Sequence, residues 1–167
     1  MTSRVAPCDT SERPTMQRAA IARAHEAAGI KVLPPAGKVF VSVRDPDKTR
    51  VLPVAQQLVA LGYSVVATQG TGAFLRENGV ACEIVNKVIE GRPHVVDLIK
   101  NGEIVYIVNT TEGRQAIADS FSIRREALQH RLTYSTTVSG ARALLQSLEY
   151  RGTGPVWSLQ ELHASIG

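Results

Sequence analysis

The chain has 167 residues, a formal net charge of +4 and 44% apolar residues, which is enough for one globular domain with a proper core. No apolar run approaches the roughly 18 residues of a membrane-spanning helix, and the two cysteines and four histidines show no metal-ligand spacing. We therefore expect a reduced cytoplasmic protein without metal or cofactor. The mild positive charge suits a small anionic ligand, whereas nucleic acid is disfavoured because no basic run or aromatic platform accompanies it.

The N-terminal part of the chain is expected to precede the main domain. Residues 1–12 are polar and predict a tail, and the alanine-rich segment 13–28 predicts a helix. The two prolines of segment 33–37 cannot lie inside a helix, so we place a linker there. The prediction is a tail, helix and linker over residues 1–36 and a single domain over residues 37–167.

Strands and helices alternate through the rest of the chain. Apolar, β-branched runs predict strands over residues 38–43, 63–68, 81–85, 104–108 and 132–135. Helices are predicted over residues 73–78, 93–100, 114–119, 120–130 and 137–148, with a last short helix from Ser158. This alternation predicts an α/β fold, a three-layer sandwich in which a five-stranded, mainly parallel, Rossmann-like sheet is flanked by helices.

The helix after the first strand contains a proline that constrains where it begins. Pro53 is best tolerated in a first helical turn, so this helix is predicted to start near Leu52 and to end at Leu61. Its buried face would then carry Leu52, Ala55, Leu58 and Val59. Lys48 would lie in the preceding loop, at the carboxyl edge of the sheet.

The segment from Val65 to Gly72 is the most informative stretch of the chain. A buried strand ends in Thr68-Gln69-Gly70-Thr71-Gly72, and a helix is expected from Ala73. The unpaired N–H groups of a helix start attract phosphate, and glycine lets a ligand approach the backbone closely. The stretch matches neither GxGxxG nor a Walker loop, so by itself it is equally compatible with an ordinary turn.

Polar residues follow every predicted strand, and the carboxyl ends of parallel strands meet at one edge of a sheet, where ligands bind. The residues expected there are Ser42, Lys48, Thr68, Thr71, Lys87, Asn109, Thr110, Thr111, Tyr134 and Thr136. Each alone has an ordinary explanation as a loop residue, but together ammonium and hydroxyl groups suit a phosphate. Asn109 suits a base edge or a ribose. Because no catalytic acid–base pair or nucleophile triad can be argued from spacing, the pattern predicts a site that binds an anion without changing it.

Several motifs resemble the methylglyoxal-synthase-like domain, above all the C-terminal allosteric domain of the carbamoyl phosphate synthetase large subunit. The matching segments are 42–48, 67–71, 85–94, 99–103 and 108–111, and the run Asn-Lys-Val-x-Glu-Gly-Arg-Pro-His is the most specific of them. The resemblance extends from about Gly37 to Ser165. Segment 16–29 also resembles the end of that subunit's preceding ATP-grasp region, which implies that residues 1–36 are a remnant of it. It implies a regulatory domain without a catalytic site, within a glutamine-hydrolysing ligase of pyrimidine and arginine biosynthesis. The implied partners are the rest of the large subunit, the glutaminase small subunit and further copies in a homo-oligomer.

The same resemblance implies ligands and residue roles. UMP would inhibit and IMP would activate from one site, with the nucleotide phosphate held by Lys48, Thr68, Thr71 and Lys87. Ribose or base would lie at Asn109 and Thr111, beside Thr110 and Ser42. Tyr134 and Thr136 match positions that help to hold ornithine, although Ser135 and Ala141 depart from the family pattern on that side.

Two alternatives to effector binding remain open at this point. One is a phosphate-eliminating lyase of the methylglyoxal synthase type, and the other is a structural module for oligomerisation of the synthetase. Methylglyoxal synthases carry a Gly-Gly-Asp motif and an Asp after the fourth strand, where this chain has Glu90-Gly91-Arg92 and Asn109. Because an asparagine cannot act as a general base, the sequence disfavours the lyase.

Overall fold

The computed structural model describes Ala24, residues 33–111 and residues 114–148. The predicted tail over residues 1–12, the helix over residues 13–28 apart from Ala24, and the helix from Ser158 lie outside the described residues. The division of the chain at residue 37 therefore stays a prediction. No helix in the described ranges is long and apolar enough to cross a membrane.

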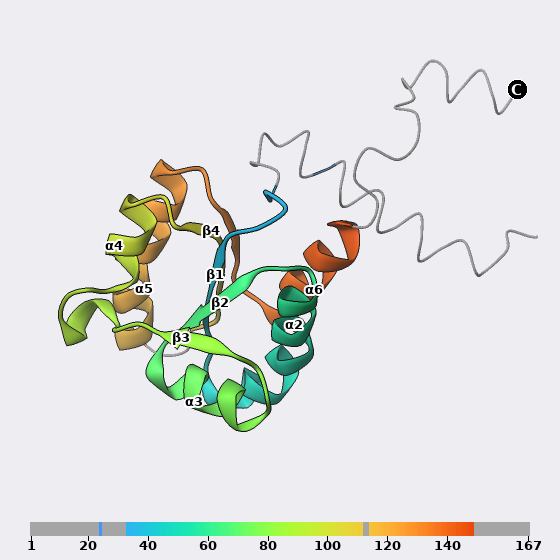
Figure 1. The fold of residues 1–167 in the computed structure, drawn as a ribbon. Helices are drawn as coiled ribbons and strands as arrows, with labels where there is room; N and C mark the ends of the chain where they lie inside the picture. The colour runs from blue at the N-terminus through green and yellow to red at the C-terminus, as the bar shows by residue number, and fades with distance from the viewer. Residues whose placement is uncertain (1–23, 25–32, 112–113, 149–167) are drawn as a thin grey trace, which may run out of the picture.

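A five-stranded, all-parallel sheet forms the central layer of the fold (Figure 1). Its strands are β1 (Lys38–Ser42), β2 (Ser64–Ala67), β3 (Cys82–Ile84), β4 (Ile104–Asn109) and β5 (Thr133–Ser135). All five predicted strands are confirmed. The strand order is β3-β2-β1-β4-β5, so the chain winds outward in one direction from β1 and in the other from β4. The topological switch point, where α/β sheets bind ligands, lies between these two strands.

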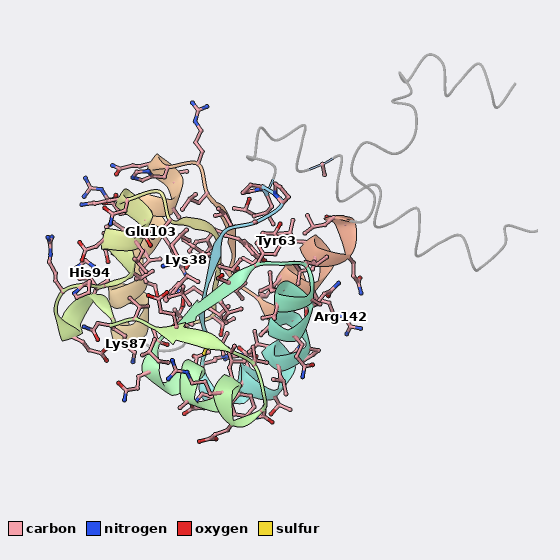
Figure 2. All side chains as sticks on the ribbon, in the orientation of Figure 1. Lys38, Tyr63, Lys87, His94, Glu103 and Arg142 are labelled. Carbon is pink, nitrogen blue, oxygen red and sulfur yellow. The ribbon has the colours of Figure 1, made fainter. Side chains whose placement is uncertain are left out.

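Helices cover both faces of the sheet, which confirms the three-layer sandwich. The α-helices are α2 (Lys48–Ala60), α3 (Gln69–Glu77), α4 (Val95–Lys100), α5 (Arg114–Gln129) and α6 (Val138–Ser147), and the 3₁₀ turns are η1 (Asp45–Asp47) and η2 (Val88–Glu90). Along β1, Val39 and Val41 pack toward α2, α3 and α6, whereas Phe40 packs toward α4 and α5. Side chains fill the space between the layers on both faces (Figure 2).

Helix α2 begins at Lys48, so the predicted start near Leu52 was wrong. The turn η1 leads straight into the helix, and Pro53 lies inside it. Pro53 lacks only the N–H that would reach the carbonyl of Thr49, and Thr49 is exposed, so water can satisfy that carbonyl. The buried residues are Val51, Val54, Ala55 and Leu58. The predicted face therefore shifts, and Val59 is 42% exposed.

Helix α3 begins at Gln69 rather than at the predicted Ala73, so the glycine–threonine segment is helical. Gly72 is explained by packing and not by a turn, because a Cβ there would collide with Cδ1 of Ile84 on β3. A side chain at this position would require the end of the Ile84 side chain or the start of α3 to move. The glycine thus lets the Ile84 side chain pack directly against the first turn of α3.

Two further helix predictions need correction. Pro93 is not the first residue of α4, which starts at Val95 after His94; the His94 N–H donates to the carboxylate of Asp97 at 3.0 Å and lowers its pKa. The two helices predicted over residues 114–119 and 120–130 are the single helix α5. Ser120 does not interrupt α5, because its side chain is buried against β4 instead of capping a new helix. Helix α6 starts as predicted: Thr137 is its N-cap and accepts a 3.0 Å bond from the Gly140 N–H.

Candidate functional site

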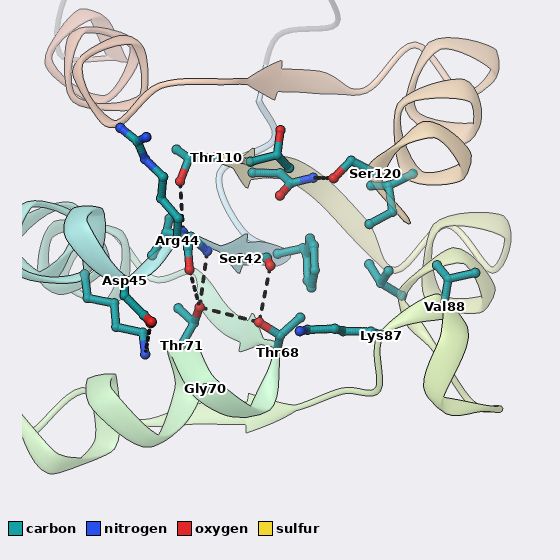
Figure 3. A pocket seen from close by; sticks show the side chains of 17 residues that line it. Ser42, Arg44, Asp45, Thr68, Gly70, Thr71, Lys87, Val88, Thr110 and Ser120 are labelled. Carbon is teal, nitrogen blue, oxygen red and sulfur yellow. Dashed lines mark hydrogen bonds and ion pairs between the residues drawn. The ribbon is translucent and has the colours of Figure 1, made fainter. Parts of the chain in front are cut away.

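A cavity of about 320 Å³ opens at the carboxyl edge of the sheet, at the switch point between β1 and β4 (Figure 3). All eight residues that the sequence assigned to the nucleotide line it: Ser42, Lys48, Thr68, Thr71, Lys87, Asn109, Thr110 and Thr111. Apolar side chains of Phe40, Val95 and Ile123 complete the wall on the α4–α5 side. The structure therefore brings the predicted set together, whereas its use for binding stays a prediction.

Two lysines supply positive charge to the cavity from opposite sides. Lys87 precedes η2, and its side chain extends toward Thr68 (Figure 3). Among the described residues it has no ion-pair partner. Lys48, in the first turn of α2, lies 2.7 Å from Asp45, whose side chain is 89% exposed; the hydrogen bond from Lys48 lowers the pKa of Asp45. A pair this exposed is weak and screened by water, so an incoming anion can compete for Lys48.

The start of α3 adds a third positive element to the cavity. Thr68 occupies the N-cap in an extended conformation, but its side chain makes no capping bond, and the first turn of this fully described helix carries no acidic residue. The ammonium of Lys48 lies close by, since a Cβ built on Gly70 would be 3.7 Å from its Nζ. A helix N-terminus and an ammonium repel one another unless an anion lies between them. This corner of the cavity is therefore suited to a phosphate.

Thr71 and Thr110 hold the segment that follows β1 from two sides. The Val43 N–H donates to Thr71 Oγ1 at 3.2 Å, and the Thr71 hydroxyl donates back to the Val43 carbonyl at 3.3 Å. From β4, Thr110 Oγ1 accepts from the Arg44 N–H at 3.2 Å. Both hydroxyls are thus engaged with the protein, and their first effect is to position the loop that carries Arg44 and Asp45.

A chain of hydroxyl groups connects Ser42 to Thr71. Thr68 donates to Thr71 at 3.4 Å, and Ser42 lies 3.2 Å from Thr68 (Figure 3). Because each hydroxyl has a single proton, and that of Thr68 is directed to Thr71, Ser42 is the donor to Thr68. In this arrangement Ser42 presents a lone pair to the cavity.

Asp47 is a structural anchor that the sequence analysis did not single out. Its carboxylate is buried, 2.7 Å from Arg44 Nε and 3.6 Å from Arg50 Nη1. The hydrogen bond from Arg44 is the main cause that lowers the pKa of Asp47, and Thr110 adds a second hydrogen bond. The Arg–Asp spacing of three residues was a visible signal for this pair, and it fixes Arg44 at the cavity mouth.

Asn109 ends β4 and is 3% exposed. Its Nδ2 donates to Ser120 Oγ at 3.1 Å and to the Tyr134 hydroxyl at 2.9 Å. Sequence reasoning missed Ser120, because nothing local in a helix marks a serine that faces a strand end. Tyr134 thus contacts a residue of the nucleotide set, although it was assigned to ornithine.

The two residues assigned to ornithine share a second hollow. Tyr134 and Thr136 both line a space of about 430 Å³ between β5 and α6. Thr136 also borders a smaller polar hollow with Arg44 and Arg50, and it does not line the main cavity. Within the described ranges, no three His, Cys, Asp or Glu side chains come together as a metal site.

Comparison with known proteins identifies the family of the chain. A family model for the MGS-like domain matches residues 50–136. The chain belongs to the MGS-like domain family. This MGS-like domain is 78% identical over 148 residues to the carbamoyl phosphate synthase large chain of Xanthomonas axonopodis, and 51% identical over 147 residues to that of Pseudomonas putida. These matches cover 89% and 88% of the chain but only 14% of either relative. It therefore spans about one seventh of the length of the curated relatives that it matches.

A solved structure supports the fold of this MGS-like domain. A methylglyoxal synthase from Elizabethkingia anophelis superposes with a TM-score of 0.56 over 68% of this chain and 79% of that one. At 16% sequence identity, the similarity shows a common fold and carries no statement about activity.

Proposed function

We propose that this MGS-like domain binds a nucleoside monophosphate and acts as the effector-binding domain of a carbamoyl phosphate synthase large chain. The observation that carries the proposal is the cavity at the switch point, where Lys48 lies beside the uncapped start of α3 and Lys87 extends toward Thr68. Among the described residues that line it, Asp45 is the only carboxylate. The excess of positive groups favours a phosphate dianion.

The rest of the cavity suits the nucleoside. Asn109, Thr111 and Ser42 supply polar atoms, and Phe40 with Ile123 supplies an apolar wall for a base. Following the sequence resemblance, we propose UMP as inhibitor and IMP as activator of a cytoplasmic enzyme in pyrimidine and arginine biosynthesis. Regulation then follows if the two nucleotides favour different arrangements of the domain against the rest of the enzyme, with couplings of about 1–3 kcal/mol.

The partners in this proposal are the remainder of the large chain, the glutaminase small subunit and further copies of the enzyme. Ornithine would bind beside Tyr134 and Thr136, in the hollow between β5 and α6. Its amino groups need carboxylates, and the described lining of that hollow contains none. Binding of ornithine to the separate domain is therefore expected to be weak.

Calorimetric titration of the 167-residue chain with UMP and with IMP tests the proposal. Both nucleotides should bind and raise the melting temperature, because a ligand that prefers the folded form stabilises it. Lys87→Ala should weaken binding about tenfold or more, the usual effect of losing a charge-assisted hydrogen bond. Lys100→Ala is the matched control, since Lys100 lies at the end of α4, 3.8 Å from Glu126 and outside the cavity.

Two results would contradict effector binding. One is the absence of both heat and melting shift with either nucleotide, which would favour a purely structural module. The other is equal affinity of wild type, Lys87→Ala and Lys100→Ala. Incubation with dihydroxyacetone phosphate tests the lyase alternative; no methylglyoxal is expected, because Asn109 is an amide and the carboxylate of Asp45 is paired with Lys48.

A further inference from the structure

The carboxamide of Asn109 is held in one orientation by two hydroxyl groups. An amide nitrogen carries two protons, and those of Asn109 are directed to Ser120 on α5 and to Tyr134 on β5, at 3.1 and 2.9 Å. Both donors are therefore used within the protein. Asn109 lines the cavity, so the atom that it leaves for a ligand is the carbonyl oxygen Oδ1.

Electrostatics favours the same orientation. The reversed amide would direct its two N–H groups into a cavity that already contains the ammonium groups of Lys48 and Lys87. The observed orientation instead presents the negative end of the amide dipole to that positive field. Asn109 is only 3% exposed, so a ligand that fills the cavity would cover its carbonyl oxygen.

We propose that Asn109 Oδ1 selects ligands that present a hydrogen-bond donor to it, and that Tyr134 and Ser120 are positioning residues that fix this polarity. The inference rests on the proposed nucleotide site and names the chemistry recognised at its non-phosphate end. A ligand that places a lone pair or a methyl group against Oδ1 leaves a buried acceptor without a partner. A site built to bond a donor rejects analogues that lack it strongly.

The donor can come from two parts of a nucleotide. A base with a ring N–H beside a carbonyl supplies one, and the ribose hydroxyls supply another. Three probes separate them: UMP, 3-methyl-UMP, which lacks the ring N–H, and 2′,3′-dideoxy-UMP, which lacks the ribose donors. We expect wild type to bind UMP at least tenfold more tightly than one of the two analogues, and that analogue identifies the donor.

The Tyr134→Phe variant tests the positioning role. Without the hydroxyl, one N–H of Asn109 loses its acceptor and the amide is free to turn. The preference for UMP over the rejected analogue should therefore shrink at least threefold, whereas a merely structural change would weaken all three probes alike. Ser120→Ala should act in the same direction. Tyr63→Phe is the matched control, because the Tyr63 hydroxyl donates to the Pro34 carbonyl at 2.7 Å, away from the cavity.

The outcomes separate this inference from the proposed function. If UMP and both analogues bind wild type equally, the selection by Asn109 is wrong although the nucleotide site stands. If none of the three binds, the nucleotide site is wrong and the inference fails with it. An unchanged preference in folded Tyr134→Phe and Ser120→Ala, as judged by circular dichroism, would overturn the positioning role.

Discussion

The two edges of the sheet use the same residue type in opposite ways. At the amino edge, Lys38 of β1 lies 2.9 Å from Glu103 and 3.1 Å from Glu83, and the hydrogen bonds to these carboxylates, first Glu103, raise the pKa of Lys38. At the carboxyl edge, Lys87 extends into an open cavity and has no carboxylate partner among the described residues. Lys38, Glu103 and Lys87 are labelled in Figure 2.

This contrast separates charge that supports the fold from charge that is kept for a ligand. The carboxylates around Lys38 neutralise it, and no further anion is required there. A cation that is left without such partners beside a helix N-terminus gains most from an external anion. Position at a strand end alone therefore does not mark a functional lysine; Lys87 has no carboxylate partner in the described part of the chain, and the one partner of Lys48 is an exposed carboxylate.

Charge reversal gives the largest expected effect and tests the contrast directly. Lys87→Glu should weaken UMP binding by about 100-fold, because an attractive contact becomes a repulsive one, with little change in melting temperature. Lys38→Glu should do the opposite, lowering the melting temperature by placing three carboxylates together while UMP affinity changes less than twofold. Calorimetry and thermal unfolding measure both. Loss of affinity in Lys38→Glu would break the comparison.

Asp47→Asn should destabilise the fold by about 2 kcal/mol at neutral pH, because a buried carboxylate partner of Arg44 is lost. The pKa of Asp47 is lowered in the folded state, so its contribution is complete above the ordinary value of about 4. That contribution is lost as the pH falls through the lowered folded value. Urea unfolding between pH 7 and pH 3 should therefore show a smaller loss of stability with acid in the variant. Parallel pH dependence in both proteins would contradict this assignment.

Thr71→Val removes the hydroxyl that holds Val43 while keeping the shape of the side chain. Thr71 is 2% exposed, so the variant leaves a buried N–H and a buried carbonyl of Val43 without this partner, at a cost of about 1.5 kcal/mol. Thr71→Ser restores the hydroxyl and should recover most of the loss. Denaturant unfolding of the two variants measures the difference. A Thr71→Val variant as stable as wild type would show that the hydroxyl does not hold Val43.

Asp45→Asn should give the smallest effect. Asp45 is exposed and competes with the nucleotide for Lys48. Its removal is therefore expected to raise UMP affinity about twofold at low ionic strength, and the gain should fade with added salt. Glu77→Gln, at the opposite end of α3, is the control for a general change in net charge. An equal gain in both variants would mean that Asp45 does not compete for Lys48.

Local sequence patterns were sufficient to predict the strands of the sheet and most of the polar residues of the candidate site. Each strand is a short apolar, β-branched run bounded by polar or glycine residues, so the period and composition mark it without tertiary information. The rule that ligands bind beyond parallel strand ends then selects one edge. Applied to the chain, it collected ten residues, and eight of them are among those that line the main cavity.

Contacts between distant segments account for what the sequence could not predict. From the sequence, Gly72 is interpreted as a turn residue, whereas in the structure the Ile84 side chain packs against it. Ser120 is interpreted as the start of a helix, whereas in the structure it accepts a hydrogen bond from Asn109. Thr71 is interpreted as a donor to the ligand, whereas in the structure its hydroxyl is hydrogen-bonded to the backbone of Val43. In each case the decisive partner is chosen by the fold, and propensity scales weigh only neighbours along the chain.

The pairing of β1 with β4 has a consequence for how the domain assembles. Between these neighbours in the sheet lie α2, β2, α3, β3 and α4, so their pairing closes a long loop, a slow and entropically costly event in folding. The opposing walls of the cavity meet only when that event is complete. A nucleotide held there therefore recognises the finished domain and not a partial one. Its binding should slow amide hydrogen exchange in β2 and β4 together, as a single cooperative unit.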